Sequence, residues 1–364
     1  MRRLPRPGPD ALRAWLVSRA AVLALLALAT YLQRAHGFGK APIRPGATGF
    51  FVWDGDWYRR IGAAGYDVTE ALRFFPLVAL PGRLVSPLGA FAAGVVLLVV
   101  VNASALVYAD GLARLTAFEL KDSTAARWVP WLVLLNPASY VLVLGYAEAT
   151  FGALAVWCFF ALRRRAWAAA AVAAYLGGLA RPVGLLLALP ALVEAVRGIG
   201  FVSRRELLAR AVAVAAAPLG AATYFAWVWA TRGDPMLPFS AQQAHGLRSG
   251  VLSSPVDELF RAARWDGSVQ YNLVLLWLPL ALLLLVLVAR RLPASYTVYA
   301  AAVLLLTVGT PRLASFLRYA LAAFPLIMVA AAPQRRGVRV VTLVVCCCGL
   351  AGYSVLAFAH SYVP

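Results

Sequence analysis

Long apolar runs alternate with short polar connections along the whole chain. A helix needs roughly 20 mostly apolar residues to cross a bilayer, and the runs predict about eleven such spans. We expect them at 11–32, 90–109, 128–144, 146–162, 166–180, 182–197, 211–230, 271–289, 294–309, 315–332 and 338–359. The stretch 128–162 fits two short spans or one long broken helix equally well. The pattern predicts an all-α, polytopic membrane protein.

Two long polar stretches interrupt this pattern, at 33–89 and 231–270. The first is rich in aromatic residues, which favours short amphipathic helices lying at the depth of the lipid headgroups. The second is polar enough to cover a site or to recognise an acceptor. Neither is long and polar enough for a separate soluble domain, so we expect 1–364 to form a single domain.

The composition agrees with a membrane protein. The chain is 62% hydrophobic and 13% charged, whereas soluble domains are roughly half apolar and about a quarter charged. The cysteines, Cys158 and 346–348, lie inside apolar runs, and the three histidines are scattered, so neither type shows metal-ligand spacing.

The net charge of +19 would usually suggest nucleic acid binding. Here the arginines occur mostly in connections between apolar runs, which instead indicates topology signals and attraction to anionic membrane lipids. We therefore expect no nucleic acid partner. Lysine occurs only at 40 and 121 while Arg, Ala and Gly abound, which is typical of a GC-rich bacterial sequence. The expected location is a bacterial plasma membrane.

Orientation follows from arginine and lysine in the short connections, which favour the cytoplasm. With the N-terminus in the cytoplasm, the basic connections near 114–127, 163–165, 197–210, 290–291 and 335–339 all lie inside. The two long loops and the polar turns near 136–148, 181–182 and 311–318 then lie outside. Several polar segments on one outer face predict a single extracytoplasmic site.

Two carboxylates, Asp54 and Asp56, stand between Trp53 and Trp57 in the first loop. Glycosyl transfer needs a base that takes a proton from the acceptor hydroxyl, and a carboxylate near an apolar boundary suits that task. Alternatively, both acids cap the following helix and pair with Arg59 and Arg60. A third possibility is that the pair binds a divalent cation such as Mg²⁺ or Mn²⁺ through its oxygens.

Glu148 is an acid inside an otherwise apolar stretch, beyond the helix-breaking pair Asn136-Pro137. An acid at such depth is costly and indicates a functional site by default. A structural interpretation pairs it with Arg181, and both interpretations can hold together. Arg181 follows Gly177-Gly178, which permits close helix approach, and its planar fork suits phosphate. The structural alternative for Arg181 is that its side chain merely snorkels, with the charged group reaching the membrane–water interface.

Arg312 and Arg318 lie close together in a short outer turn. They offer a cationic pocket at the depth where a polyprenyl phosphate headgroup would lie, with snorkelling again as the alternative. His245, in the second loop, is expected to be structural or exposed.

In order, these segments resemble the PIG-V family, the second-mannose transferases of GPI-anchor assembly with bacterial relatives, within the GT-C superfamily. Its W-D…I…G-Y…F-F-P-L loop matches Trp53-Asp54, Ile61, Gly65-Tyr66 and 74–77. Its N-P-A-S…Y-S-E-S segment matches 136–139 and 146–149, with Ala147 and Ala149 replacing both serines. Its late S-x-x-R-Y…F-P element matches Ser315, Arg318-Tyr319 and Phe324-Pro325, and Arg181 stands where the family has an arginine.

The resemblance implies a GT-C-type helical bundle and an inverting transferase. The donor would be a polyprenyl-phosphate sugar, usually mannose, used on the extracytoplasmic face. Bacteria make no GPI, so the acceptor is another lipid, a lipoglycan or a protein. Because acids and arginines converge on one membrane face, the leading hypothesis makes Asp54 the base with Asp56 assisting. The remaining residues are expected to bind the donor phosphate or substrate: Arg59, Tyr66, Asn136, Glu148, Arg181, Arg312 and Arg318.

Two rival functions remain open. A transporter or flippase of lipid-linked sugars would also place acids and arginines along a path. Such proteins tend to show repeated halves and polar groups at the bilayer midplane, and the sequence has no convincing internal repeat. The other rival is an inactive relative that serves as a scaffold subunit, against which the intact Asp54 loop argues weakly.

Overall fold

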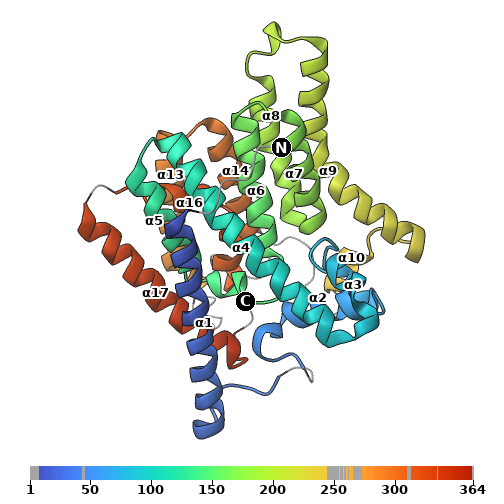
Figure 1. Cartoon of the computed structure of the whole chain (residues 1–364), viewed down its shortest axis with the longest axis vertical. Helices are drawn as coiled ribbons and strands as arrows, with labels where there is room; N and C mark the ends of the chain where they lie inside the picture. The colour runs from blue at the N-terminus through green and yellow to red at the C-terminus, as the bar shows by residue number, and fades with distance from the viewer. Residues whose placement is uncertain are drawn as a thin grey trace.

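The computed structural model describes residues 8–42, 46–243, 273–309, 313–333 and 335–362, with isolated positions between 254 and 264. These residues form helices and connecting segments without a strand, as the hydrophobic pattern predicted. Figure 1 shows a bundle in which the first helix and the last lie side by side.

Five described helices are long and apolar enough to cross a membrane. They are α1 (Pro9–His36), α4 (Ala90–Leu120), α9 (Arg204–Arg232), α13 (Val274–Arg291) and α17 (Arg336–Phe358). Each covers one predicted apolar run. Shorter helices complete the bundle: α5 (Ser123–Leu134), α6 (Glu148–Arg163), α7 (Trp167–Ala180), α8 (Ala188–Val196), α14 (Ala294–Val308), α15 (Phe316–Ala320) and α16 (Phe324–Ala330).

Three predicted spans are not continuous α-helices, and the structure corrects them. Within the run 128–144, the α-helix ends at Leu134, before Asn136-Pro137. The rest of this run contains only a 3₁₀ turn, Ser139–Leu142. The run 182–197 begins with the 3₁₀ segment Pro182–Leu187, and 315–332 divides into α15 and α16. Proline lacks an N–H donor and disfavours a helical residue before it, which explains the first two breaks. Apolar composition alone did not reveal them, although the sequence identified Asn136-Pro137 as a helix-breaking pair and left a broken helix over 128–162 open.

Small residues set the spacing between α7 and α9. A Cβ atom on Gly178 would lie 2.1 Å from the Ala217 carbonyl oxygen, and one on Gly220 would lie 2.0 Å from that of Tyr175. Only glycine permits this approach, which confirms the close packing predicted from Gly177-Gly178. The contact fixes the end of α7, from which Arg181 extends.

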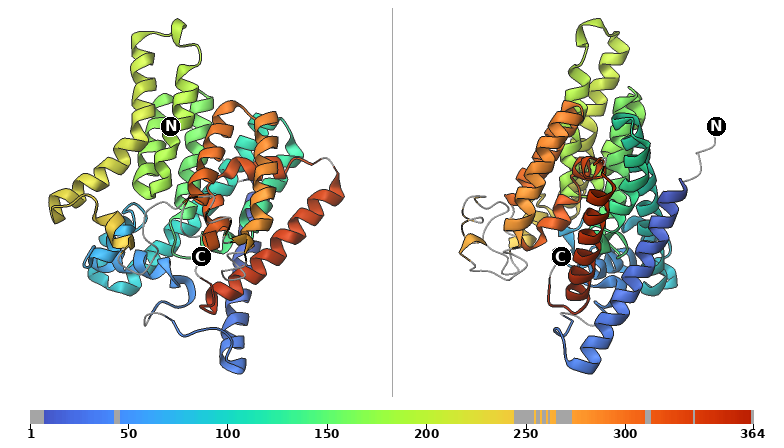
Figure 2. Two further views of the ribbon diagram at one scale, coloured as in Figure 1. Left: turned by 180° about the vertical axis from the view of Figure 1, so that it is seen from behind. Right: turned by 90° about the vertical axis from the view of Figure 1, so that its left-hand side faces the viewer.

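The first long loop folds into short helices, as predicted. It contains α2 (Asp54–Ala64), α3 (Leu80–Leu84) and several 3₁₀ turns, and α2 and α3 pack against α4. The Tyr224 hydroxyl of α9 donates 2.6 Å to the Leu72 carbonyl. The short helix α10 (Leu237–Gln243) also lies against this loop, as seen from behind in Figure 2.

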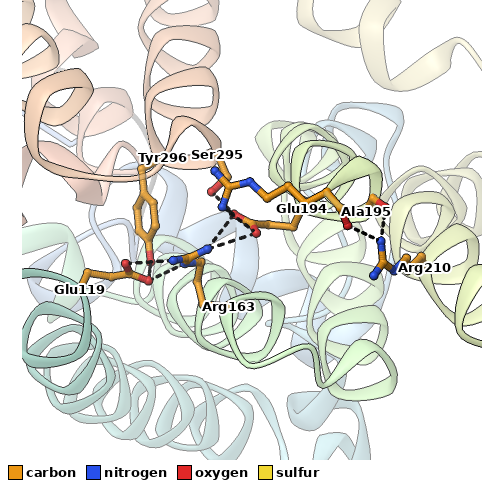
Figure 3. A network of polar contacts seen from close by, with 8 residues as sticks. Glu119, Arg163, Glu194, Ala195, Arg210, Ser295 and Tyr296 are labelled. Carbon is orange, nitrogen blue, oxygen red and sulfur yellow. Dashed lines mark hydrogen bonds and ion pairs between the residues drawn. The ribbon is translucent and has the colours of Figure 1, made fainter. Parts of the chain in front are cut away.

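A second polar network joins helix ends far from this loop (Figure 3). Arg163, at the end of α6, pairs with Glu119 of α4 at 2.7 Å and with Glu194 of α8 at 3.2 Å. The Ser295 hydroxyl at the start of α14 donates 2.6 Å to Glu194, and the Tyr296 hydroxyl donates 3.1 Å to Glu119. These are the helix ends that the charge pattern assigns to the cytoplasmic side.

Candidate active site

The first loop is fixed just before its acidic pair. Trp53 has φ 56° and ψ −117°, a conformation that costs roughly 1–3 kcal/mol in a non-glycine residue. Its indole N–H donates 3.1 Å to the Ala357 carbonyl of α17, and its ring lies 5.5 Å from that of His360. These contacts hold the strained turn, after which Asp54 starts α2.

Four charged side chains from distant parts of the chain meet at this turn. Arg318 of α15 donates from Nη2 to Oδ2 of Asp54 at 2.5 Å and from Nε to Oε1 of Glu148. Arg181, just past α7, pairs with the same Glu148 oxygen at 2.8 Å. The Glu148–Arg181 pair predicted from sequence is therefore confirmed.

Burial differs sharply within this cluster. The side chains of Glu148, Arg318 and Arg181 are 3%, 7% and 11% exposed, whereas Asp54 is 27% exposed. Two acids and two arginines balance in charge, which is what makes their burial tolerable. Asp54 is thus the member that a ligand reaches most readily.

Two tyrosines complete the cluster. Tyr146 was matched from the sequence only as part of a motif, and Tyr58 was given no role. The Arg318 guanidinium carbon lies 4.7 Å above the Tyr146 ring, a cation–π contact. Tyr58 stands four residues after Asp54, on the same face of α2, a spacing that could have identified it. Burial raises the pKa of Tyr58, so its phenol stays protonated and can donate a hydrogen bond.

Two buried polar atoms in the cluster lack a hydrogen-bond partner among the described residues, Oε2 of Glu148 and the Tyr146 hydroxyl oxygen. Buried polar atoms are nearly always paired, and an exception calls for an explanation such as a ligand. The cluster therefore presents unused hydrogen-bonding capacity beside Asp54 and Arg318.

The remaining predicted residues make contacts outside this four-residue cluster. Asp56 pairs with Arg59 at 2.7 Å, three residues along α2, as the alternative interpretation of that acid expected. The Tyr66 hydroxyl donates 2.7 Å to the Phe74 carbonyl, and its ring packs 5.0 Å from Trp227 of α9. These contacts shape the loop around the cluster.

Asn136 stabilises the turn at which the helical run breaks. Its side-chain oxygen accepts a 3.1 Å bond from the Ala138 amide, which closes the turn after α5. Arg312 and His245 lie outside the described residues, as does most of the 231–270 loop.

The geometry does not fit a divalent cation held between Asp54 and Asp56. Each carboxylate lies against a different guanidinium, that of Arg318 or of Arg59. Across the described ranges, there is no cluster of three or more His, Cys, Asp or Glu side chains placed to hold a metal.

Comparison with known proteins yields structural likeness only. No family model matches the chain, and no curated protein matches its sequence. Similar solved structures include an oligosaccharyltransferase, AglB, from the archaeon Archaeoglobus fulgidus, in complex with an inhibitory peptide and a dolichol-phosphate, at 14% identity and a TM-score of 0.46. A second structure, of an A. fulgidus oligosaccharyltransferase in complex with Zn and sulfate, is similar at 14% sequence identity and a TM-score of 0.47. The alignments cover 95% and 94% of this chain but only 56% and 53% of theirs, so the chain spans about half their length.

Proposed function

We propose that this chain is an inverting GT-C-type glycosyltransferase of the kind that the PIG-V resemblance implies. It moves a hexose, mannose in our proposal, from a polyprenyl-phosphate donor to a lipid, lipoglycan or protein acceptor. The observation that carries the proposal is the cluster of Asp54, Glu148, Arg181 and Arg318. An accessible carboxylate beside two buried guanidiniums is what transfer from a lipid phosphate requires: a base and a cationic site for the leaving group.

The reaction assigns one step to Asp54. Its carboxylate removes the proton from an acceptor hydroxyl as that oxygen attacks the anomeric carbon of the sugar. The new glycosidic bond forms on the face opposite the departing group, and the bond from the anomeric carbon to the phosphate oxygen breaks. Polyprenyl phosphate leaves with the electron pair, and the configuration at the anomeric carbon inverts.

Arg318 couples donor binding to the state of the base. Without a ligand its guanidinium neutralises Asp54 at 2.5 Å. A donor phosphate offers Arg318 another anion, and the release of Asp54 from this pair leaves the carboxylate ready to accept a proton. The donor then prepares the base, so that an acceptor is deprotonated only when a sugar is present.

The other cluster members orient the substrates. Glu148 holds both arginines through Oε1, while its Oε2 is placed to accept from sugar hydroxyls. The Tyr146 hydroxyl can bind a sugar hydroxyl or donate to a phosphate oxygen. Arg312 is proposed as a further phosphate ligand. Arg59 with Asp56, Tyr66 and Asn136 support the loop and the turn that bound the substrate site.

We place the reaction on the extracytoplasmic face of a bacterial plasma membrane. The support is the arginine pattern together with α6, which carries Glu148 of the candidate site at one end and Arg163 of the second network at the other. The 16 residues of α6 separate the two clusters by about 23 Å, a large part of a hydrocarbon core of about 30 Å.

The decisive experiment compares two acids of the same loop in purified protein reconstituted with a polyprenyl-phosphate mannose carrying a radioactive sugar. Asp54→Asn should lower transfer to membrane lipid or protein acceptors by roughly 10²–10⁴-fold, the usual contribution of a general base. Asp67→Asn is the matched control, because Asp67 is 42% exposed and pairs only loosely with Arg60 at 3.6 Å. It should transfer normally.

Near wild-type transfer by Asp54→Asn would show that the base is another group. Sugar movement across proteoliposomes without a new glycosidic bond would instead favour the flippase alternative. A wild-type protein with neither activity would favour the scaffold alternative.

A further inference from the structure

Arg19 places a guanidinium inside the apolar part of α1, ten residues after the helix begins. It donates from Nε to the Asn102 side-chain oxygen of α4 at 2.9 Å and from Nη2 to the Leu142 carbonyl at 2.9 Å. A third bond, from Nη1 to the Ser18 hydroxyl, spans 2.7 Å. The guanidinium carbon lies 4.9 Å from the ring centre of Trp15. Arg19 therefore links α1, α4 and the broken segment that leads to Glu148.

The charge of Arg19 has no counterpart in these contacts. All three acceptors are neutral, and no ion pair joins Arg19 to a carboxylate among the described residues. Of the five N–H groups of a guanidinium, three are used, so two remain. A charge in a spanning helix is expensive unless an anion compensates it. A clamp between helices explains the hydrogen bonds but leaves the charge unexplained.

A pocket opens beside this guanidinium. It encloses about 230 Å³ between α1, α4 and the two segments that contain Phe50 and Val143. Typical ligand pockets hold roughly 300–1,000 Å³, so this one suits a headgroup and the first part of a chain rather than a whole lipid. Leu23, on its rim, is 51% exposed, and Val99 on the neighbouring α4 is 62% exposed. These apolar surfaces on long apolar helices point toward lipid.

The wall of this pocket is also the wall of the candidate active site. The Phe50 carbonyl accepts a 3.1 Å bond from the Gly145 amide, joining the Asp54 loop to the segment that ends at Glu148. A Cβ atom on Gly55, next to Asp54, would lie only 3.1 Å from that same Phe50 oxygen. A group bound at Arg19 therefore stands directly behind the catalytic loop.

We propose that this pocket binds the phosphate of the spent polyprenyl carrier, with Arg19 as its anion ligand. The choice of carrier rests on the proposed function, whereas the choice of an anionic lipid phosphate rests on the charge of Arg19 and the apolar rim. Loss of the sugar turns a phosphodiester into a phosphomonoester, which is the stronger anion. Arg19 lies beside the loop and has two unused N–H donors. It is therefore suited to hold that product away from Arg181 and Arg318, which bind the next donor molecule.

Photolabelling tests this assignment. The protein is reconstituted in phosphatidylcholine nanodiscs with a polyprenyl phosphate that carries a diazirine near its phosphate, and labelled peptides are mapped by mass spectrometry. Wild type should be labelled near Leu23 and Leu98. In Arg19→Gln the yield of that label should be at least tenfold lower than in wild type. Arg318→Gln should keep it. Asn102→Ala is the matched control, because it removes one hydrogen bond of Arg19 but leaves the charge, and it should keep most of the label.

Absence of label at this pocket in wild type, or equal label in Arg19→Gln, would overturn the proposal. Competition by phosphatidylglycerol as strong as that by unlabelled polyprenyl phosphate would also overturn it, because the site would then hold any anionic lipid. If Arg19→Gln does not fold, this competition on the wild type decides alone. Label at Arg19 in a protein that transfers no sugar would defeat only the proposed function, and transfer without such label would defeat only this inference.

Discussion

Arg318 holds Asp54 at 2.5 Å across 264 residues of sequence, and the same guanidinium donates to Glu148. One cation therefore pairs with two carboxylates, one of them almost fully buried. Loss of Arg318 should therefore lower both stability and activity, and a second substitution in the cluster should restore stability without restoring activity.

Arg318→Gln should leave two carboxylates with only Arg181 to compensate them. Breaking a buried pair on one side costs roughly 3–5 kcal/mol, so we expect a clearly lower melting temperature in detergent. The double variant Arg318→Gln with Glu148→Gln removes one stranded charge and should recover much of the loss. Neither variant should transfer sugar. Recovery of transfer together with stability would show that Arg318 has a purely structural role.

Sequence reasoning identified the members of the cluster better than their connections. Glu148 and Arg181 could be paired in advance because a buried acid needs a nearby cation. The bond from Arg318 to Asp54 could not, because nothing in a sequence reports a contact over such a separation. Asp54 and Asp56 are chemically identical in the sequence, yet the fold gives one to Arg318 and the other to Arg59.

In the fold as well, composition predicted the elements, whereas local chemistry and packing decided their details. The long apolar runs appeared as helices where predicted, whereas the breaks at Asn136-Pro137 and between α15 and α16 follow from local chemistry that hydropathy does not register. Arg163 was predicted only as a topology charge, because its partners Glu119 and Glu194 lie on other helices.

The network around Arg163 should act on stability alone. Arg163→Met leaves Glu119 and Glu194 buried with less compensation, and we expect a loss of about 3–5 kcal/mol by the same desolvation argument. Transfer per folded molecule should stay unchanged, since α6 separates this network from Glu148. Thermal unfolding and transfer rates measured on the same preparation check this. Arg205→Gln, at an exposed arginine near the same end of the bundle, is the control and should unfold as wild type does. A specific loss of transfer at unchanged stability would contradict this division.

The strained turn at Trp53 should matter for positioning. Trp53→Phe keeps an aromatic ring but removes the N–H bond to Ala357, worth roughly 0.5–1.5 kcal/mol net. With less to hold its φ of 56°, the turn should relax and carry Asp54 away from Arg318, lowering transfer severalfold. Trp157→Phe is the counterpart, because the Trp157 indole N–H has no partner among the described residues. It should transfer normally, and equal effects of the two variants would exclude the positioning role.

The Tyr146 hydroxyl offers the cleanest separation of ligand binding from folding. Because this buried oxygen has no hydrogen-bond partner of ordinary geometry among the described residues, Tyr146→Phe removes a polar group that contributes little to the stability of the free protein, and its melting temperature should be nearly unchanged. If the hydroxyl binds the sugar or the phosphate, transfer should fall by about tenfold, the equivalent of about 1.4 kcal/mol. Tyr224→Phe should behave in the opposite way, because that hydroxyl donates 2.6 Å to the Leu72 carbonyl and does not belong to the charged cluster. It should lose roughly 1–3 kcal/mol of stability, the cost of an orphaned acceptor, and keep its transfer rate per folded molecule. A Tyr146→Phe protein with full transfer would remove this hydroxyl from the substrate site.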